Sequence, residues 1–307
     1  MPTAFITHRD CQLHDMGRHH PECPERLQAI EDQLIASGLI GCLVEHEAPL
    51  VELEQLARVH DLGYIHAVEA SSPSTGLVHL DPDTAMNPDT YRAARRAAGA
   101  VVLATDLVLG GTAHNAFCAV RPPGHHAESR RAMGFCLFNN VAVGVAHALD
   151  AYERGRVAVV DFDVHHGNGT EEIFRRDERV LMVSTFQHPF YPYSGVEGRS
   201  ERMVNVPLPA YTDGTGFRRA VVEEWLPALE RFRPEAVFIS AGFDAHREDD
   251  MASLGLVEAD YVWVTERIQE VADRYAGGRI VSVLEGGYNL SALARSVTAH
   301  LKVLAGV

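Results

Sequence analysis

The stretch Val157-Ala-Val-Val-Asp-Phe-Asp-Val-His-His-Gly-Asn168 leads from an apolar run directly into a group of carboxylates and imidazoles. Residues 157–160 have the length and the β-branched bias of a buried parallel strand. Because side chains alternate along a strand with period two, Asp161, Asp163 and His165 begin on the same side. Two carboxylates and an imidazole at a strand end are costly to desolvate unless a cation joins them. The stretch therefore predicts a strand that ends in a metal site; the alternative is a solvated loop with a chance charge pair.

The same pattern of a short apolar run followed by a helical pattern recurs along the chain. The other apolar runs lie at residues 117–120, 180–183, 236–239 and 280–284. Helical patterns lie at residues 25–37, 88–109, 139–154, 213–231 and 257–275. Alternating strands and helices indicate a parallel sheet covered by helices on both faces. No internal repeat occurs, and the loop at residues 71–76 is too short to separate domains, so we expect one α/β domain over residues 1–307.

Polar clusters follow three of the other apolar runs. His125 and His126 come shortly after the first run, Asp244 follows the run at 236–239, and Tyr288 follows the run at 280–284. Ligands of open α/β sheets bind beyond the carboxyl ends of the strands. We therefore expect these residues to meet in one crevice. The two glycines before Tyr288 permit positive φ, so the turn can direct the tyrosine inward.

Carboxylate and imidazole ligands suit a hard or borderline divalent ion, of which zinc and iron(II) are the leading candidates. A catalytic site has few protein ligands and keeps a position for water. We predict that Asp163, His165 and Asp244 hold one Zn²⁺, with Fe²⁺ as the alternative, and that Asp161 lies behind them.

Composition excludes several classes of function. The chain has 307 residues, 46% of them hydrophobic, which is typical of a globular protein. With 27 basic and 42 acidic residues its net charge is −15, which argues against nucleic-acid binding and against docking on anionic membranes. Lysine-rich peptides and polyamines remain compatible partners, and the sequence indicates no oligomeric state. The lack of a signal-peptide pattern and of a long apolar run, with five scattered cysteines and no C-x-x-C pair, predicts a cytoplasmic location.

Six motifs in chain order resemble the histone deacetylase and acetylpolyamine amidohydrolase family, within the arginase-like α/β fold. They are HPECPER at 20–26, RPPGHH at 121–126, GFCLFN at 134–139, DFDVHHGN at 161–168, GFD at 242–244 and EGGY at 285–288. They span essentially the whole chain. Asn168 and the Arg-Pro-Pro-Gly form are similar to the class II branch, so the chain resembles a bacterial class II-like deacetylase.

The resemblance implies zinc-dependent hydrolysis of an acetylated amine, with the metal on the same three ligands. It implies that His125 and His126 form an acid/base pair and that Tyr288 faces the scissile carbonyl. It also implies a structural potassium ion near Asp161, Asp163, His165, Ser184 and Thr185.

Amide hydrolysis requires proton transfers and stabilisation of an oxyanion, and we expect the polar residues beside the metal to provide them. We expect His126 to take the proton of the attacking water; His126 is also the candidate to protonate the leaving amine, with His125 as an electrostatic partner held by Asp161. Asn168 stands where other branches carry aspartate, and a neutral amide leaves His126 less basic. We expect the Tyr288 hydroxyl to donate to the oxyanion. The alternatives are loop histidines and a core tyrosine.

The substrate channel is predicted from three segments. Gly134 and Phe135 should form one wall of a narrow apolar channel. Tyr191 is the candidate for the opposite wall, where the family usually has phenylalanine; both aromatic residues have the alternative of lying in the core. Arg26 is expected near the channel foot, where acetate leaves, or as a salt-bridge residue.

Met251 helps to predict the class of substrate. Polyamine-specific members place an acidic gatekeeper at the channel mouth, and seven residues past Asp244 this chain has methionine. We therefore expect acetyl-lysine in a peptide or protein as substrate, with acetylated polyamine as the alternative. The adjacent acids at residues 248–250 keep that alternative open.

The sequence disfavours two other functions. An arginase-like ureohydrolase needs a second metal and a further aspartate two residues after Asp244, where this chain has His246. A non-catalytic module that binds acyl-lysine would not need the intact group of His125, His126 and Tyr288.

Overall fold

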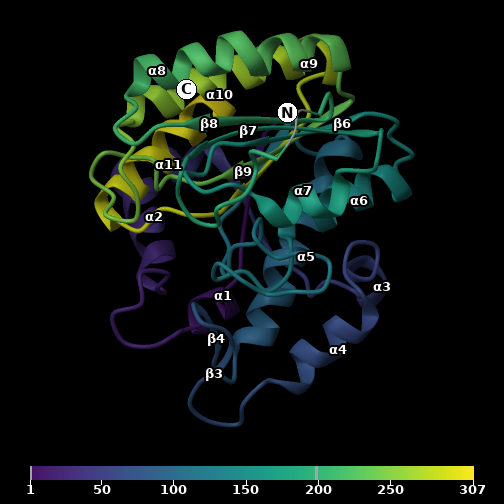
Figure 1. The fold of residues 1–307 in the computed structure, drawn as a ribbon, viewed down its shortest axis with the longest axis vertical. Coiled ribbons are helices and arrows are strands. Elements are labelled where there is room, and N and C mark those ends of the chain that lie inside the picture. Colours follow the sequence, from purple (N-terminus) through teal and green to yellow (C-terminus); the bar gives the residue numbers. More distant parts are fainter. Residues whose placement is uncertain (1, 198–199) are drawn as a thin grey trace.

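A computed structural model describes residues 2–197 and 200–307, and its centre is one sheet of eight parallel strands (Figure 1). The strands are β1 (Thr3–Thr7), β2 (Leu43–Glu47), β5 (Asn115–Cys118), β6 (Val157–Asp161), β7 (Val180–Gln187), β8 (Met203–Leu208), β9 (Ala236–Ala241) and β10 (Ile280–Leu284). Their order across the sheet is β2-β1-β5-β10-β9-β6-β7-β8. A short antiparallel hairpin of β3 (Val78–Asp81) and β4 (Thr84–Met86) lies apart from this sheet.

All five predicted strands are present, four of them with shifted ends. β10 matches its predicted run, β7 extends to Gln187, and β5 begins at Asn115. The sequence analysis missed β1, β2 and β8. β2 and β8 are the edge strands, and their partly exposed side chains interrupt the apolar run on which the predictions rested.

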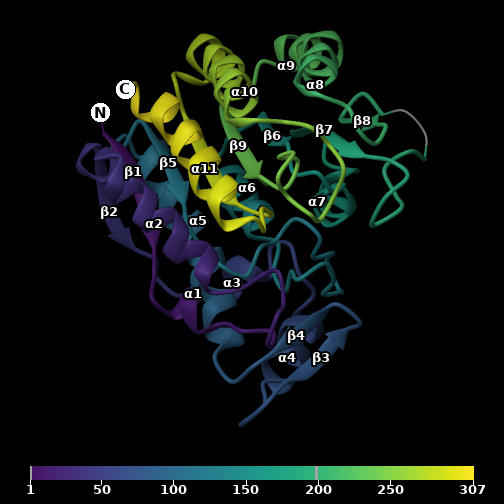
Figure 2. The same cartoon turned by 90° about the vertical axis from the view of Figure 1, so that its left-hand side faces the viewer.

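Helices cover both faces of the sheet, as predicted. They are α1 (Asp10–Leu13), α2 (Glu25–Ala36), α3 (Leu53–Leu56), α4 (Leu62–Ala70), α5 (Thr90–Leu109), α6 (Asn140–Ala151), α7 (Asn168–Phe174), α8 (Gly214–Ala220), α9 (Leu226–Phe232), α10 (Glu258–Val271) and α11 (Leu290–Ala305). The 3₁₀ turn η1 (Leu39–Cys42) precedes β2, and the π-helical segments η2 (Val221–Trp225) and η3 (Ala272–Ala276) continue α8 and α10. Helix α11 packs between α2 and α10, and α5 packs on α6 (Figure 2).

Neighbouring residues of the central strands show that these helix groups lie on opposite faces. On β10, the Ser282 hydroxyl lies 3.0 Å from Nε2 of His300, a residue of α11. On β9, Ile239 is the register partner of Ser282 and shares its face, so Phe238 points to the other face. There Phe238 packs against Gly144 of α6 so closely that a Cβ on this glycine would lie 3.0 Å from the ring. Both sides of the central strands are therefore buried.

The strand order explains why distant motifs meet. β5, β10, β9 and β6 are the four adjacent strands at the centre of the sheet. Their carboxyl ends lead into the motifs that carry the two adjacent histidines, Tyr288, Asp244 and Asp163, respectively. Because all four strands are parallel, these motifs emerge at one edge of the sheet.

In the described ranges, no helix is both long and apolar enough to cross a membrane. All five cysteines are free thiols.

Candidate active site

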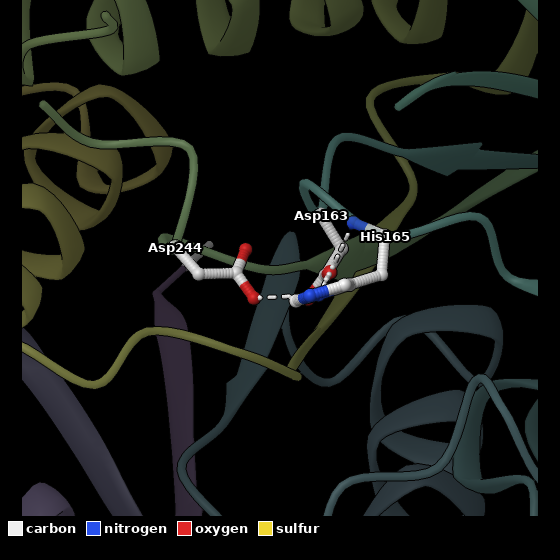
Figure 3. A group of neighbouring side chains, drawn as sticks. All are labelled: Asp163, His165 and Asp244. Atoms are coloured by element: carbon white, nitrogen blue, oxygen red, sulfur yellow. Dashed lines mark hydrogen bonds and ion pairs between the residues drawn. The ribbon is translucent and has the colours of Figure 1, made fainter. Parts of the chain in front are cut away.

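Asp163, His165 and Asp244 are buried and point toward one another at the carboxyl edge of the sheet (Figure 3). Nδ1 of His165 lies 3.1 Å from Oδ1 of Asp163 and 3.2 Å from Oδ2 of Asp244. One ligand atom from each residue lies within 4.8 Å of the others. Two ligands bound to one zinc ion at 2.0–2.2 Å with tetrahedral angles would be about 3.3–3.6 Å apart. The spacing of these side chains therefore suits a single ion.

Backbone amides hold the two carboxylates. Oδ2 of Asp163 accepts the N–H of Gly286 at 2.9 Å, and Oδ1 of Asp244 accepts the N–H of Val164 at 2.9 Å. Oδ2 of Asp244 is buried and accepts no hydrogen bond of good geometry from the described groups. A buried carboxylate oxygen that lacks a donor suits a metal ligand.

The electrostatics of this group also favour a cation. Burial disfavours a charged His165, but the carboxylates of Asp163 and Asp244 outweigh it and raise the pKa of His165 to about 10. Burial and the neighbouring charge of Asp163 raise the pKa of Asp244 to about 6. Both shifts have one cause: the buried carboxylates need positive charge between them, which a divalent ion would supply.

Glycine is required beside these ligands because the backbone approaches them closely. A Cβ on Gly286 would lie 2.0 Å from Oδ2 of Asp244 and 2.6 Å from Oδ2 of Asp163. We expect Gly286→Ala to fold and to bind Zn²⁺ roughly 10- to 100-fold more weakly, the usual cost of disturbing the groups that orient metal ligands. Competition against a chelator of known affinity measures this. Gly41→Ala is the control, since a Cβ there meets nothing within 4 Å. Equal zinc affinity of the two variants would contradict the prediction.

The two adjacent histidines have different partners. Nδ1 of His125 lies 3.0 Å from Oδ2 of Asp161, and its Nε2 lies 3.7 Å from Oδ1 of Asp163. Nδ1 of His126 lies 2.8 Å from Oδ1 of Asn168. The Asn168 amide nitrogen donates to Oε1 of Glu128 at 2.9 Å, which fixes the orientation of the amide. The Asn168 oxygen therefore accepts the Nδ1 proton of His126, and the unprotonated Nε2 is left to act as a base.

These partners move the two pKa values in opposite directions. Burial disfavours the charged form of His125, but the charges of Asp163 and Asp161 outweigh it and raise its pKa well above the ordinary value. Burial, together with the positive charges of His125 and His165, lowers the pKa of His126 well below its ordinary value. The arrangement therefore pairs a cationic His125 with a neutral His126.

Glu285 holds the loop that carries the histidines. Its Oε2 accepts the backbone N–H groups of Gly124 at 2.7 Å and His125 at 3.1 Å. Burial raises the pKa of Glu285 to about 7 despite the nearby charge of His125. The sequence analysis noted Glu285 only as part of a motif, because its partners lie on another strand's loop.

Tyr288 follows Gly287, whose φ of 121° is open to glycine and strained for other residues. Burial and the charge of Asp244 raise the pKa of Tyr288 well above its ordinary value, so its hydroxyl stays a donor. The tyrosine ring lies between Phe135, with a centroid distance of 5.9 Å, and the Arg26 guanidinium, 5.0 Å from the ring centre.

Arg26 is fully buried behind Tyr288. Its Nε donates to the Gly287 carbonyl at 2.6 Å, and its Nη1 donates to Oε1 of Glu22 at 3.0 Å. Glu22 also accepts from the buried Arg121 of the Arg-Pro-Pro-Gly motif. Burial opposes ionisation of Glu22, but Arg121, then His14 and then Arg26 hold its pKa well below the ordinary value. This buried ion network ties the N-terminal motif to the loop of Tyr288.

A cavity of about 270 Å³ leads to these groups. It is lined by Asp83, His126, Gly134, Phe135, His165, Phe190, Tyr191, Met251 and Tyr288. The predicted wall residues Gly134, Phe135 and Tyr191 and the predicted mouth residue Met251 all line it, whereas Arg26 is not among the lining residues.

The sequence analysis missed two residues of this cavity. Phe190 stacks on His165 with a centroid distance of 5.7 Å, and it was passed over in favour of the adjacent Tyr191. Asp83 comes from the turn between β3 and β4, and its Oδ1 accepts the N–H of Gly134 at 3.0 Å. No apolar run or metal motif marks that turn.

The acids at 248–250 do not face the cavity in the way that a gatekeeper would. Glu248 pairs with Arg295 at 2.8 Å, and Asp250 is exposed. Asp249 is buried, and its Oδ2 accepts the backbone N–H of Tyr288 at 2.6 Å. None of the three is among the residues that line the cavity.

Ser184 and Thr185, predicted beside a structural potassium ion, are buried on β7, the strand that pairs with β6. Ser184 is the register partner of Asp161. Its Oγ is buried and has no hydrogen-bond partner among the described groups. Such an orphaned oxygen fits a cation ligand.

Comparison with known proteins agrees with this geometry. Residues 20–304 match the histone deacetylase domain. The chain belongs to the histone deacetylase family.

Relatives extend over nearly the whole chain. A histone deacetylase-like amidohydrolase of Pseudomonas aeruginosa is 37% identical over 329 residues, which cover 99% of this chain and 86% of that protein. The polyamine deacetylase HDAC10 of Mus musculus is 37% identical over 336 residues, which cover 100% of this chain and 48% of the mouse protein. The crystal structure of the HDA15 HD domain has a TM-score of 0.93 at 36% identity, and the match covers 99% of this chain and 88% of that one.

The resemblance carried by the six motifs and the predicted fold are therefore confirmed, and this member of the histone deacetylase family is an amidohydrolase.

Proposed function

We propose that this deacetylase hydrolyses the acetyl or short acyl amide on the ε-amine of lysine in peptides or proteins. The observation that carries the proposal is the cavity: a narrow space with Phe135, Tyr191 and Met251 on its walls ends at His126, His165 and Tyr288. The aliphatic stem of a lysine suits apolar walls, and the amide would stop among groups that can polarise and protonate it.

We assign one Zn²⁺, with Fe²⁺ as the alternative, to Asp163, His165 and Asp244. When bound, such an ion polarises the scissile carbonyl and lowers the pKa of the attacking water. A structural K⁺ is proposed beside Asp161, Asp163, His165, Ser184 and Thr185. The orphaned Ser184 hydroxyl supports this assignment.

The chain's own residues supply the proton transfers. Nε2 of the neutral His126 accepts a proton from water, and the resulting imidazolium returns it to the leaving amine. Asn168 fixes the His126 ring through the 2.8 Å bond at Nδ1. The Tyr288 hydroxyl donates to the carbonyl oxygen as negative charge develops there. His125 and Asp161 form the ion pair behind this group.

Acetylated polyamine is the second candidate substrate. Asp83 supports it, because it places one carboxylate among the lining residues, although that carboxylate already accepts the Gly134 amide. A relative at 37% identity is a polyamine deacetylase by name.

One kinetic panel tests the proposal: acetyl-lysine peptides, longer acyl-lysine peptides and acetylated polyamines at matched concentrations. We expect the highest kcat/KM on an acetyl-lysine peptide. A strong preference for acetylated spermidine would instead favour the second candidate, and no hydrolysis of any amide would overturn the proposal.

Met251 offers a direct test of substrate class. We expect Met251→Glu to raise kcat/KM for acetylated spermidine relative to an acetyl-lysine peptide by roughly 2- to 5-fold, the range of a partly exposed ion pair with the distant ammonium. Met251→Gln is the neutral control of similar size. The gain should shrink as salt is raised, because salt screens this attraction. If both variants change the ratio of the two kcat/KM values equally, a negative charge at position 251 does not select the substrate.

A further inference from the structure

Asp249 binds the loop of Tyr288 by its backbone. One carboxylate oxygen, Oδ2, accepts the N–H of Tyr288 at 2.6 Å and that of Asn289 at 2.9 Å. The other oxygen, Oδ1, accepts the N–H of Met251 at 3.0 Å. One side chain therefore joins the tyrosine at the foot of the cavity to the methionine on its wall.

The carboxylate of Asp249 is buried, with only 5% of the residue exposed. In the described ranges no lysine or arginine forms a salt bridge with it, and three backbone N–H groups donate to it. Burying a carboxylate is costly, and hydrogen bonds to the charged form offset that cost. An acid held in this way stabilises one arrangement of the loops that donate to it.

Three successive residues of the Tyr288 loop are held by hydrogen bonds from different side chains. Gly286 is held by Asp163 through its N–H, and Gly287 is held by Arg26 through its carbonyl. Asp249 is the partner of the N–H of Tyr288 itself, one bond from the Cα that carries the phenol side chain. Asp249 therefore fixes the backbone at the residue that carries the hydroxyl.

We propose that Asp249 is a positioning residue that places the Tyr288 hydroxyl for the reaction. The inference rests on the proposed function, in which Tyr288 donates to the oxyanion. The competing role is purely structural: Asn289 caps the first turn of α11, and Asp249 would then only stabilise this helix start.

A double-mutant cycle between Asp249 and Tyr288 separates the two roles. We expect Asp249→Ala to lower kcat on an unactivated acetyl-lysine peptide about 100-fold, with KM changed less than about threefold, because misplacing a catalytic group by about 1 Å can cost this much. In a Tyr288→Phe background the same change should lower kcat less than about threefold, because the hydroxyl that Asp249 positions is already gone.

The conservative variant and a neighbour complete the design. Asp249→Asn keeps one acceptor for Tyr288 and should retain kcat to within about 10-fold, with a smaller loss in the Tyr288→Phe background. Asp250→Ala removes the same charge from the adjacent, exposed residue and should leave kcat and KM unchanged. Bound zinc and thermal unfolding are measured for every variant. If Asp249→Ala does not fold, Asp249→Asn carries the cycle.

The outcomes distinguish the inference from the proposed function. Wild-type kcat in Asp249→Ala, or losses that multiply in the double variant, would overturn the positioning role while leaving the proposed function intact. Absence of amide hydrolysis in the wild type, or full activity of Tyr288→Phe, would overturn the proposed function of Tyr288 itself.

Discussion

Asp163→Ala is expected to give a folded chain that retains no zinc and hydrolyses an acetyl-lysine peptide at least about 10³-fold more slowly than the wild type. The change removes a ligand oxygen from a group of only three and leaves Asp244 facing His165 alone. Loss of the ion removes several kcal/mol of stabilisation of developing charge, and each 1.36 kcal/mol is tenfold in rate. Metal content by mass spectrometry and kcat on the same preparation provide the measurement.

The design must separate loss of metal from loss of structure. Asp163 also accepts the amides of His165 and Gly286, so alanine removes bonds as well as charge. Asp163→Asn keeps the shape of the side chain, and it should also lose zinc. A tight chelator should abolish wild-type activity, and added zinc should restore it. Full turnover in a demonstrably metal-free wild-type preparation would refute the assignment.

The parts of the fold that could be predicted are those buried on both faces. β6 and β10 are surrounded by other strands and helices, so their sequences are nearly continuous apolar runs. β2 and β8 lie at the edges, and the polar residues on their partly exposed faces conceal them in a search for such runs. The order of the strands cannot be read from these local patterns, because it depends on pairing between segments far apart in the chain.

The candidate site divides in the same way. Groups that bind or react, such as Asp163 and His126, sit in dense motifs directly after strands, and the sequence marks them. Groups that hold the site through backbone amides do not stand out. Asp249 looked like one acid in a run of three, yet its partner Tyr288 is 39 residues away. Glu285 was part of a motif, yet its bonds reach Gly124, 161 residues away.

The Tyr288 hydroxyl is the second group with a large expected effect. Tyr288→Phe is expected to fold, to bind zinc normally and to lose roughly 10²–10³ in kcat on an unactivated acetyl-lysine peptide, the usual effect of removing one oxyanion donor. Phenylalanine keeps the ring between Phe135 and Arg26, so the packing of the loop should persist. Because its pKa is raised, the wild-type hydroxyl stays protonated and can donate throughout the neutral range.

The loss in kcat should be smaller for a substrate whose own substituents stabilise the developing oxyanion. A trifluoroacetyl-lysine peptide carries its own electron-withdrawing group, which stabilises the developing oxyanion, so Tyr288→Phe should slow its hydrolysis much less than that of the acetyl peptide. Tyr211→Phe, at a residue that is 85% exposed, is the matched control and should match the wild type on both substrates. Equal losses on both peptides would point to misplaced substrate rather than a missing donor. A near-wild-type kcat of Tyr288→Phe on the acetyl peptide would remove Tyr288 from the mechanism.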